Sequence, residues 1–234
     1  QAMGYLPEAF LNYLGRMAWS MPDEREKFDL ETMIEHFDLK RISLGGPIFD
    51  VTKLDWLNGT WIREDLDDDA FADQVAEWAL NRDHLKQLIP LVRPRVNKWS
   101  DLVGIAGFFL DGLMQLTPED LESKGLELDD VRRVFAYSLW ALDAEPNWSG
   151  DAIQGVLRTT AAVMGLKLRI YLAPIFVAIS GRKSATPLFN TMAILGRDIC
   201  RARIRHAMET IKPMSGKERQ RWRKAYDQAM AEHA

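Results

Sequence analysis

VRRVFAYSLWAL, residues 131–142, is the stretch that sets the fold class of this chain. Its apolar residues, among them Val131, Phe135 and Leu142, recur at helical spacing, which is the pattern of an α-helix with one buried face. Similar spacing recurs along most of the 234 residues, no sustained strand alternation appears, and no fixed-period repeat is evident. The sequence therefore predicts an all-α protein.

Capping residues predict where several helices begin and end. Asp29 and Ser149 are expected N-caps, and Ser100 is expected to cap a further helix. Gly59 is placed to end a helix that begins near Val51. Further helix ends are expected at Gly165 and Gly196, and a kink or break is expected where one helix meets Pro90 and Pro94.

Composition is that of an ordinary globular protein, with 47% hydrophobic and 27% charged residues. No apolar run reaches the ~18–20 residues that span a bilayer, so no membrane partner is expected. Cys200 is the only cysteine, which excludes an internal disulfide and fits the reducing cytoplasm. We expect it to be a small buried hydrophobe.

Gln1 and Ala2 are interpreted as a cloning remnant, and the abrupt start at Gly4–Pro7 suggests a piece of a longer protein.

Charge is distributed unevenly along the chain. Residues 151–234 hold 15 Lys and Arg against 6 Asp and Glu, whereas residues 1–150 hold 15 against 28. A basic C-terminal part suggests a polyanionic partner, and solvated helix faces are the alternative. The acidic run at 65–69 is interpreted as a solvated, loop-like boundary rather than a metal site.

Motifs for catalysis and for metal binding are not found. Gly104 and Gly107 lie in an apolar helix and predict a packing site rather than a phosphate loop. No nucleophile elbow is present. We therefore predict no catalytic residue, no metal ligand and no cofactor in this chain. Its four histidines are scattered, without metal-site spacing: His36, His84, His206 and His233.

Two stretches have the residues to bind a polyanion. VRPRVNKW, residues 92–99, offers Arg93 and Arg95 on a proline-stiffened turn, and guanidinium groups suit phosphates and base edges. Core packing is the favoured interpretation of Trp99, and stacking on a base is the alternative. GRKSATPLF, residues 181–189, is a basic loop entering a helix N-terminus, where free N–H groups favour acceptors.

Arginines also line the C-terminal helices. Arg197, Arg201 and Arg205 are four residues apart and share one helical face. With Arg93 and Arg169, they are candidates for contact with an RNA backbone. A solvated helix surface explains them equally well.

GYLPEAFLNYL, residues 4–14, resembles the segment after the second ATP-binding signature of bacterial-type glutamyl-tRNA synthetases. The match is specific over residues 1–63 and looser to about residue 212, while residues 215–234 carry no motif that we can place. The blocks that agree in order and spacing are IEHFDL (34–39), GPIFD (46–50), KLDWLNG (53–59), GLK (165–167), AISG (178–181), Leu188-Phe189 and ILG (194–196).

This resemblance implies a layout and an activity. Residues 1–64 would be a stem-contact region, and an α-helical-cage anticodon-binding domain would follow in two subdomains, residues 65–150 and 151–234. The parent would be a class I glutamate–tRNA ligase that attaches glutamate to tRNA with ATP and Mg. Both ATP-binding signatures lie N-terminal to residue 1 in the family, so the chain alone is predicted to be inactive.

The resemblance also implies site residues. Arg95 corresponds to the family arginine that contacts the last anticodon base, and Leu188 to a leucine that packs on an anticodon base, with Thr186 and Pro187 beside it. Many family members carry an arginine where this chain has Phe176. The missing donor shifts recognition of one base to Arg169, Arg182 or Lys183, or leaves that base unrecognised.

Two alternatives stay open. A stand-alone helical interaction module would bind a protein partner and would show no salt-sensitive binding to glutamate tRNA. A dual-specificity glutamate and glutamine enzyme would tolerate exchange of the last anticodon base, and Arg95 argues against it.

Overall fold

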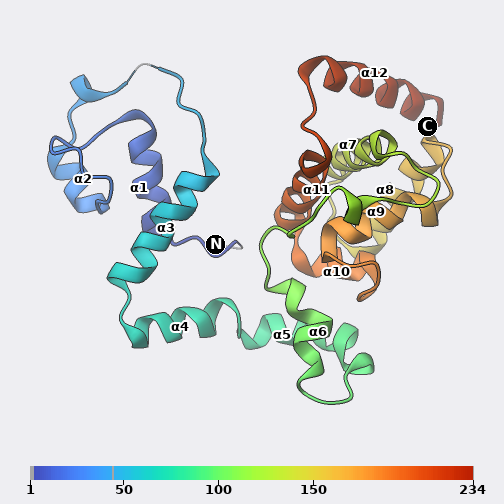
Figure 1. Ribbon diagram of the computed structural model, residues 1–234, viewed down its shortest axis with the longest axis horizontal. Helices are drawn as coiled ribbons and strands as arrows, with labels where there is room; N and C mark the ends of the chain where they lie inside the picture. The colour runs from blue at the N-terminus through green and yellow to red at the C-terminus, as the bar shows by residue number, and fades with distance from the viewer. Residues whose placement is uncertain (1–2, 44, 234) are drawn as a thin grey trace. The chain divides into compact units, whose positions relative to one another are not determined.

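The computed structural model describes residues 3–43 and 45–233, and Gln1 and Ala2, interpreted above as a cloning remnant, lie outside them. This part of the chain consists of α-helices and short 3₁₀ turns without a β-strand, which confirms the all-α prediction (Figure 1). The helices are α1 (Pro7–Ala18), α2 (Leu30–His36), α3 (Val51–Asp65), α4 (Asp68–Trp78), α5 (Arg82–Val92), α6 (Asp101–Ala106), α7 (Leu128–Ala144), α8 (Gly150–Val163), α9 (Leu168–Ser180), α10 (Leu188–Leu195), α11 (Arg197–Ile211) and α12 (Gly216–His233).

The chain divides into two compact units, residues 1–81 and residues 82–234. In the first unit, α1 packs against α3 around Tyr13, Leu54 and Leu57. Buried Asn12 accepts a bond from the indole N–H of Trp61 at 3.1 Å and a second from the backbone of the α1–α2 connection. A second small cluster, Trp19, Met21 and Phe28, lies in the same unit, and the bonds of Asn12 link α1 to α3 and to the α1–α2 connection.

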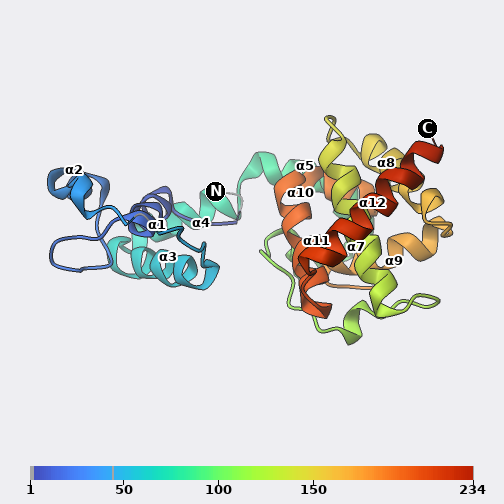
Figure 2. The same ribbon diagram turned by 90° about the horizontal axis from the view of Figure 1, so that it is seen from above.

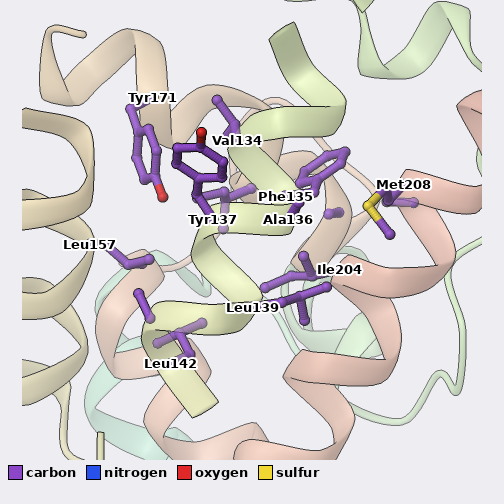
Figure 3. Close-up of a cluster of buried hydrophobic side chains, with 14 of the residues drawn as sticks. Val134, Phe135, Ala136, Tyr137, Leu139, Leu142, Leu157, Tyr171, Ile204 and Met208 are labelled. Atoms are coloured by element: carbon purple, nitrogen blue, oxygen red, sulfur yellow. The ribbon is translucent and has the colours of Figure 1, made fainter. Parts of the chain in front are cut away.

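The second unit is built around α7, which contacts α8, α9, α11 and α12. Figure 3 shows Leu139 of α7 beside Ile204 of α11 in the centre of this core. Tyr171 of α9 is fully buried, its hydroxyl hydrogen-bonds Ser138 of α7, and burial raises the pKa of that hydroxyl. The 131–142 stretch is therefore the central helix of the larger core, and it is buried on more than the one face that its spacing indicated.

A smaller core lies beside it in the same unit. Leu88, Leu91 and Val92 of α5 pack with Phe108 and Phe109, which follow α6. Side chains from the loop before α10 and from the end of α10 join this cluster. The small core therefore ties α5 and α6 to α10.

The last helix, α12, is fixed by a buried arginine. Arg132 of α7 donates to Asp129 at 2.6 Å, to Glu218 at 3.2 Å and to the carbonyl of Lys212 at 3.0 Å. Its guanidinium lies 5.1 Å from the ring of Trp222. These contacts join α7 to the start of α12, which packs across α7 and α8 (Figure 2).

Several predicted helix ends are confirmed. Asp29 and Ser149 accept bonds from backbone N–H groups at the starts of α2 and α8. Gly165 follows α8 with φ +66°, and Gly196 separates α10 from α11 with φ +84°. Both glycines adopt a backbone conformation that side chains disfavour, which is why the helices end there.

Other predicted boundaries are wrong. Gly59 does not end α3, which continues to Asp65 because its buried residues pack on α1, and this outweighs the helix cost of one glycine, ~1 kcal/mol. The acidic run at 65–69 is non-helical only at Leu66 and Asp67, which separate α3 from α4, and the other three residues are helical. Asp67 caps α4 through a 2.8 Å bond from the N–H of Ala70. Carboxylates suit a helix N-terminus because its dipole end is positive.

Three further sequence predictions near α6 differ from the structure in part. Helix α5 continues through Pro90 and ends at Val92, two residues before Pro94, so the expected break occurs at the second proline and not at the first. Ser100 precedes α6 without a side-chain capping bond, and the Asp101 carboxylate organises this turn instead. Gly104 lies on α6 with open space where a Cβ would be, so the predicted close packing at this glycine is wrong.

Candidate nucleic-acid interface

The first predicted binding stretch forms an exposed 3₁₀ turn, Arg93–Arg95, directly after α5. The Arg95 guanidinium donates one bond to the carbonyl of Leu91 at 2.7 Å. Since a guanidinium has five N–H donors, this bond holds the side chain while leaving further donors for a ligand. The turn therefore presents two exposed cations on a short, proline-containing segment.

Trp99 does not pack in the core, and the favoured interpretation of this residue was wrong. Its side chain is 88% exposed. The physical reason is the turn before α6: the Asp101 carboxylate accepts bonds from the N–H groups of Asn97 and Lys98, both at 3.1 Å, and pairs with the Lys98 ammonium. That pairing lowers the pKa of Asp101. The turn is thereby fixed with Trp99 outside the small core.

The second stretch, residues 181–187, begins where α9 ends. Gly181 ends α9 with φ +67°, and the Ser180 hydroxyl donates to the carbonyls of Phe176 at 2.8 Å and Arg182 at 3.2 Å. Arg182 and Lys183 are exposed. The Arg182 guanidinium donates to the carbonyl of Gly104 on α6. This bond ties the basic loop to α6, the helix that follows the first stretch.

The end of the loop is anchored in the protein. Thr186 is 1% exposed, and its hydroxyl hydrogen-bonds that of Thr191 at 2.6 Å. Pro187 is exposed, whereas Leu188, the first residue of α10, is 8% exposed and belongs to the larger core. Among these three predicted contact residues, Pro187 presents the most open side chain, and Thr186 positions the loop.

The fold brings the two stretches together. Helix α10 packs against α5, and Ala185 of the loop contacts the small core that also contains Leu91 and Val92. We call the exposed side chains of Arg93, Arg95, Arg182, Lys183 and Pro187 the Arg95 surface. Residues almost ninety positions apart in the sequence thus come from two exposed segments, the turn after α5 and the α9–α10 loop, that pack on the same small core.

Arg169 lies elsewhere. It is exposed in the first turn of α9, whereas Arg182 follows the last turn of the same helix. At about 1.5 Å of rise per residue, roughly 17 Å of helix separates them. Phe176 is half-buried and packs against the larger core. Three donors were considered as substitutes for the family arginine that is Phe176 in this chain. Arg182 and Lys183 belong to the Arg95 surface, whereas Arg169 lies at the other end of α9.

The arginines of α11 divide into exposed and engaged side chains. Arg197 donates to the carbonyl of Glu145 at 2.6 Å and lies 5.2 Å from the ring of Trp148. Arg201 pairs with Asp143 at 2.6 Å. Arg205 is exposed. Two of the three predicted backbone contacts are therefore already engaged within the chain.

Arg203 is an arginine that supports the candidate site from the core, and its burial was not predicted from the sequence. It is fully buried and donates to the carbonyls of Phe108 at 2.7 Å, Gly112 at 2.8 Å and Ile179 at 2.6 Å, with a further bond to Asp111. It therefore links the segment after α6 to the end of α9, directly before the basic loop. A signal existed, because residue 203 falls on the apolar face that runs through residues 199, 200, 204 and 207.

Other predicted features are as follows. Cys200 is buried, as expected, and burial raises the pKa of its thiol to about 12. In residues 3–43 and 45–233, no cluster of three or more His, Cys, Asp or Glu side chains has the arrangement of a metal site. None of the helices in the same residues combines the length and apolarity needed to cross a bilayer.

Two known families match parts of this chain. Residues 70–208 match the family described as an anticodon binding domain, and residues 1–56 match the catalytic domain of class I tRNA synthetases (E and Q). Because the first match covers more than half of the sequence, the chain belongs to the anticodon binding domain family.

Individual relatives agree with this. The chain is 52% identical over 226 residues to a glutamate–tRNA ligase of Marinomonas sp. and 46% identical over 226 residues to that of Marinobacter nauticus. Each match covers 97% of this chain and 46% of the ligase, so the chain spans about half the length of these curated relatives. The resemblance to glutamyl-tRNA synthetases is confirmed.

A solved structure has a similar fold. It is described as a glutamate tRNA ligase from Elizabethkingia meningosepticum in complex with its amino acid. It matches with a TM-score of 0.52 at 23% identity, over 89% of this chain and 42% of that one. At this identity the match supports the helical fold alone.

Proposed function

We propose that this chain binds tRNA and recognises the anticodon of glutamate tRNA, as the RNA-binding part of a glutamate–tRNA ligase. The observation that carries the proposal is the Arg95 surface, where packing of α5, α6 and α10 gathers exposed cations from residues 93–95 and 182–183. Anticodon bases are unpaired, and proteins recognise such bases by hydrogen bonds to their edges and by apolar contacts.

Arg95 is the proposed base-recognition residue. Its bond to the Leu91 carbonyl fixes the guanidinium, and a fixed planar donor loses little freedom when it meets the acceptors of a base. Cytosine presents an acceptor at N3 where uracil and guanine present an N–H donor, so one guanidinium can discriminate cytosine from these two bases. Arg182 and Lys183 supply the hydrogen-bond donors that Phe176 lacks, and Pro187 and Leu188 supply apolar surface.

We assign parts of the chain in the same way. Residues 1–64 are the proposed stem-contact region, and residues 65–150 and 151–234 are the proposed subdomains of the anticodon-binding domain. The contacts proposed for the RNA backbone come from Arg93, Arg169, Arg197, Arg201 and Arg205. Because Arg197 and Arg201 already contact the protein, we expect the exposed arginines to contribute more.

The activity of the whole ligase is the attachment of glutamate to tRNA with ATP and Mg, in the cytoplasm. We propose that this chain by itself catalyses neither aminoacylation nor ATP–pyrophosphate exchange. Either activity above background in the purified chain would contradict this part of the proposal.

The test is a titration of the chain with glutamate tRNA at about 50 and 200 mM salt. We expect binding that weakens as salt rises, because cations on the protein displace counterions from the RNA. A tRNA with the last anticodon base exchanged should bind more weakly. Absence of salt-sensitive binding would favour a protein-interaction module, and equal binding of the exchanged tRNA would favour dual specificity.

A further inference from the structure

Trp99 and its neighbours form an apolar patch on the surface of the second unit. Trp99 is 88% exposed, Val103 is 74% exposed and Leu102 is 39% exposed. We call these three residues the Trp99 patch. The exposed indole of Trp99 contributes nothing to the core. An exposed apolar patch bordered by polar residues is typical of a binding site.

The turn that carries Trp99 is held in place. The N–H of Leu102 donates to the carbonyl of Trp99 at 3.1 Å, and the N–H of Asp101 donates to that of Lys98 at 3.0 Å. The Asp101 carboxylate fixes the turn from the other side. A ligand therefore meets a backbone that is already ordered, and little conformational entropy is lost on binding.

Cations border this patch. Exposed Arg93 and Arg95 precede it, and Arg182 reaches α6 through its bond to the carbonyl of Gly104, next to Val103. Asp101, the carboxylate of the turn, is paired with Lys98. An exposed aromatic ring beside free cations is the combination that proteins use for single-stranded nucleic acid.

We propose that Trp99 stacks on an unpaired base of the anticodon loop of tRNA, close to the base that Arg95 contacts. This inference rests on the proposed function of the Arg95 surface. Trp99 lies four positions after Arg95, so their Cα atoms are at most ~14 Å apart. One RNA loop therefore spans both side chains.

The size of the patch favours a base over a protein partner. Three side chains are far fewer than the roughly 20–30 residues that each partner contributes to a stable protein interface. One indole and one valine match the area of a single base. Trp99 is thus an additional binding residue, which neither the family resemblance nor the comparisons assign.

The experiment compares Trp99→Phe, Trp99→Leu and Trp99→Ala in the full chain by titration with glutamate tRNA. Loss of base stacking weakens RNA binding roughly 5- to 100-fold, and we expect this for Ala and Leu, whereas Phe keeps most of the affinity. Ile89→Ala is the matched control, since Ile89 is an exposed apolar residue of α5 outside the patch. It should bind as the wild type does.

Two further measurements identify the contact. The salt dependence should be unchanged in all Trp99 variants, because no phosphate contact is removed. Abasic substitution of the stacked loop nucleotide should abolish the difference between wild type and Trp99→Ala. Thermal unfolding of each variant checks that the fold is intact, as expected for an exposed side chain.

The outcomes are distinguishable from those of the proposed function. If the wild type binds tRNA and Arg95→Ala binds weakly, but Trp99→Ala binds like the wild type, the stacking proposal is overturned alone. Full affinity of Trp99→Leu would also overturn it, since leucine has no aromatic face. If the wild type does not bind tRNA at all, the proposed function itself fails.

Discussion

The helical bundle around α7 and the Arg95 surface use the same residue type in opposite ways. In the bundle, Arg203 and Arg132 are fully buried and bind backbone carbonyls and carboxylates from several segments. On the Arg95 surface, Arg93 and Arg95 are exposed, and Arg95 donates to a carbonyl one turn earlier in the chain. Burial therefore decides whether an arginine supports the fold or is available to a ligand.

The two regions are also connected. The carbonyls that Arg203 binds belong to residues 108–112 and to the end of α9. These segments flank α6 and the basic loop, which carry the Trp99 patch and Arg182. A buried arginine thus helps to hold the exposed ones in position, and mutations can separate the two roles.

The largest expected effect is that of Arg203→Met. Methionine keeps the apolar stem but leaves several buried carbonyls without a donor, so we expect the free energy of unfolding to fall by about 3–5 kcal/mol. Urea unfolding measures this. Arg205→Ala on the same helix is the control and should change stability by less than ~0.5 kcal/mol. Similar values for both would contradict the proposed structural role of Arg203.

Arg95→Ala tests the exposed arginines of the Arg95 surface. We expect tRNA binding to weaken by about 1–3 kcal/mol and the choice at one anticodon position to relax, with little change in stability. Arg95→Lys is the matched control: it keeps the charge and the salt dependence but loses the planar donor geometry. Unchanged discrimination between cognate and exchanged tRNA in Arg95→Ala would show that this residue does not select a base.

Arg201→Ala tests an arginine that is neither fully buried, as Arg203 is, nor exposed, as Arg95 is. Its pair with Asp143 is partly exposed, and such pairs contribute only about 0–1 kcal/mol, so we expect a small loss of stability. A double-mutant cycle with Asp143→Ala measures the coupling. In RNA titrations, Arg205→Ala should lower the salt slope more than Arg201→Ala does. The reverse order would mean that Arg201 leaves its partner to bind RNA.

The smallest expected effect concerns pH. Bonds from the backbone N–H and hydroxyl of Ser215, and from Arg132, lower the pKa of Glu218 from 4.5 to about 2. The ionised carboxylate therefore stabilises the fold above about pH 4.5, and this contribution is lost as pH falls from there toward 2. Wild type and Glu218→Gln should differ in urea midpoint at pH 7 and converge near pH 2–3. A constant difference across this range would contradict the assignment.

The sequence predicted helices well and their ends less well. Asp29, Ser149 and Gly196 acted as expected because a cap depends on atoms within a few residues. Gly59 did not end its helix, since contacts of α3 with α1 outweighed the local preference. For the candidate site, the sequence identified the two basic stretches, but Trp99 was assigned to the core and Arg203 was not recognised as buried.

By itself, the sequence determined the helical class, the capped helix ends, the resemblance to glutamyl-tRNA synthetases and the two stretches that carry Arg95 and Arg182. These features depend on the identity of residues and on their spacing along the chain, which can be read directly from the sequence. Only the tertiary structure decided which arginines are exposed, that Trp99 is exposed, and that residues 93–99 and 181–187 pack on the same small core. Burial and long-range contact depend on how α5, α6 and α10 pack, and that packing is set by the whole core rather than by any one segment.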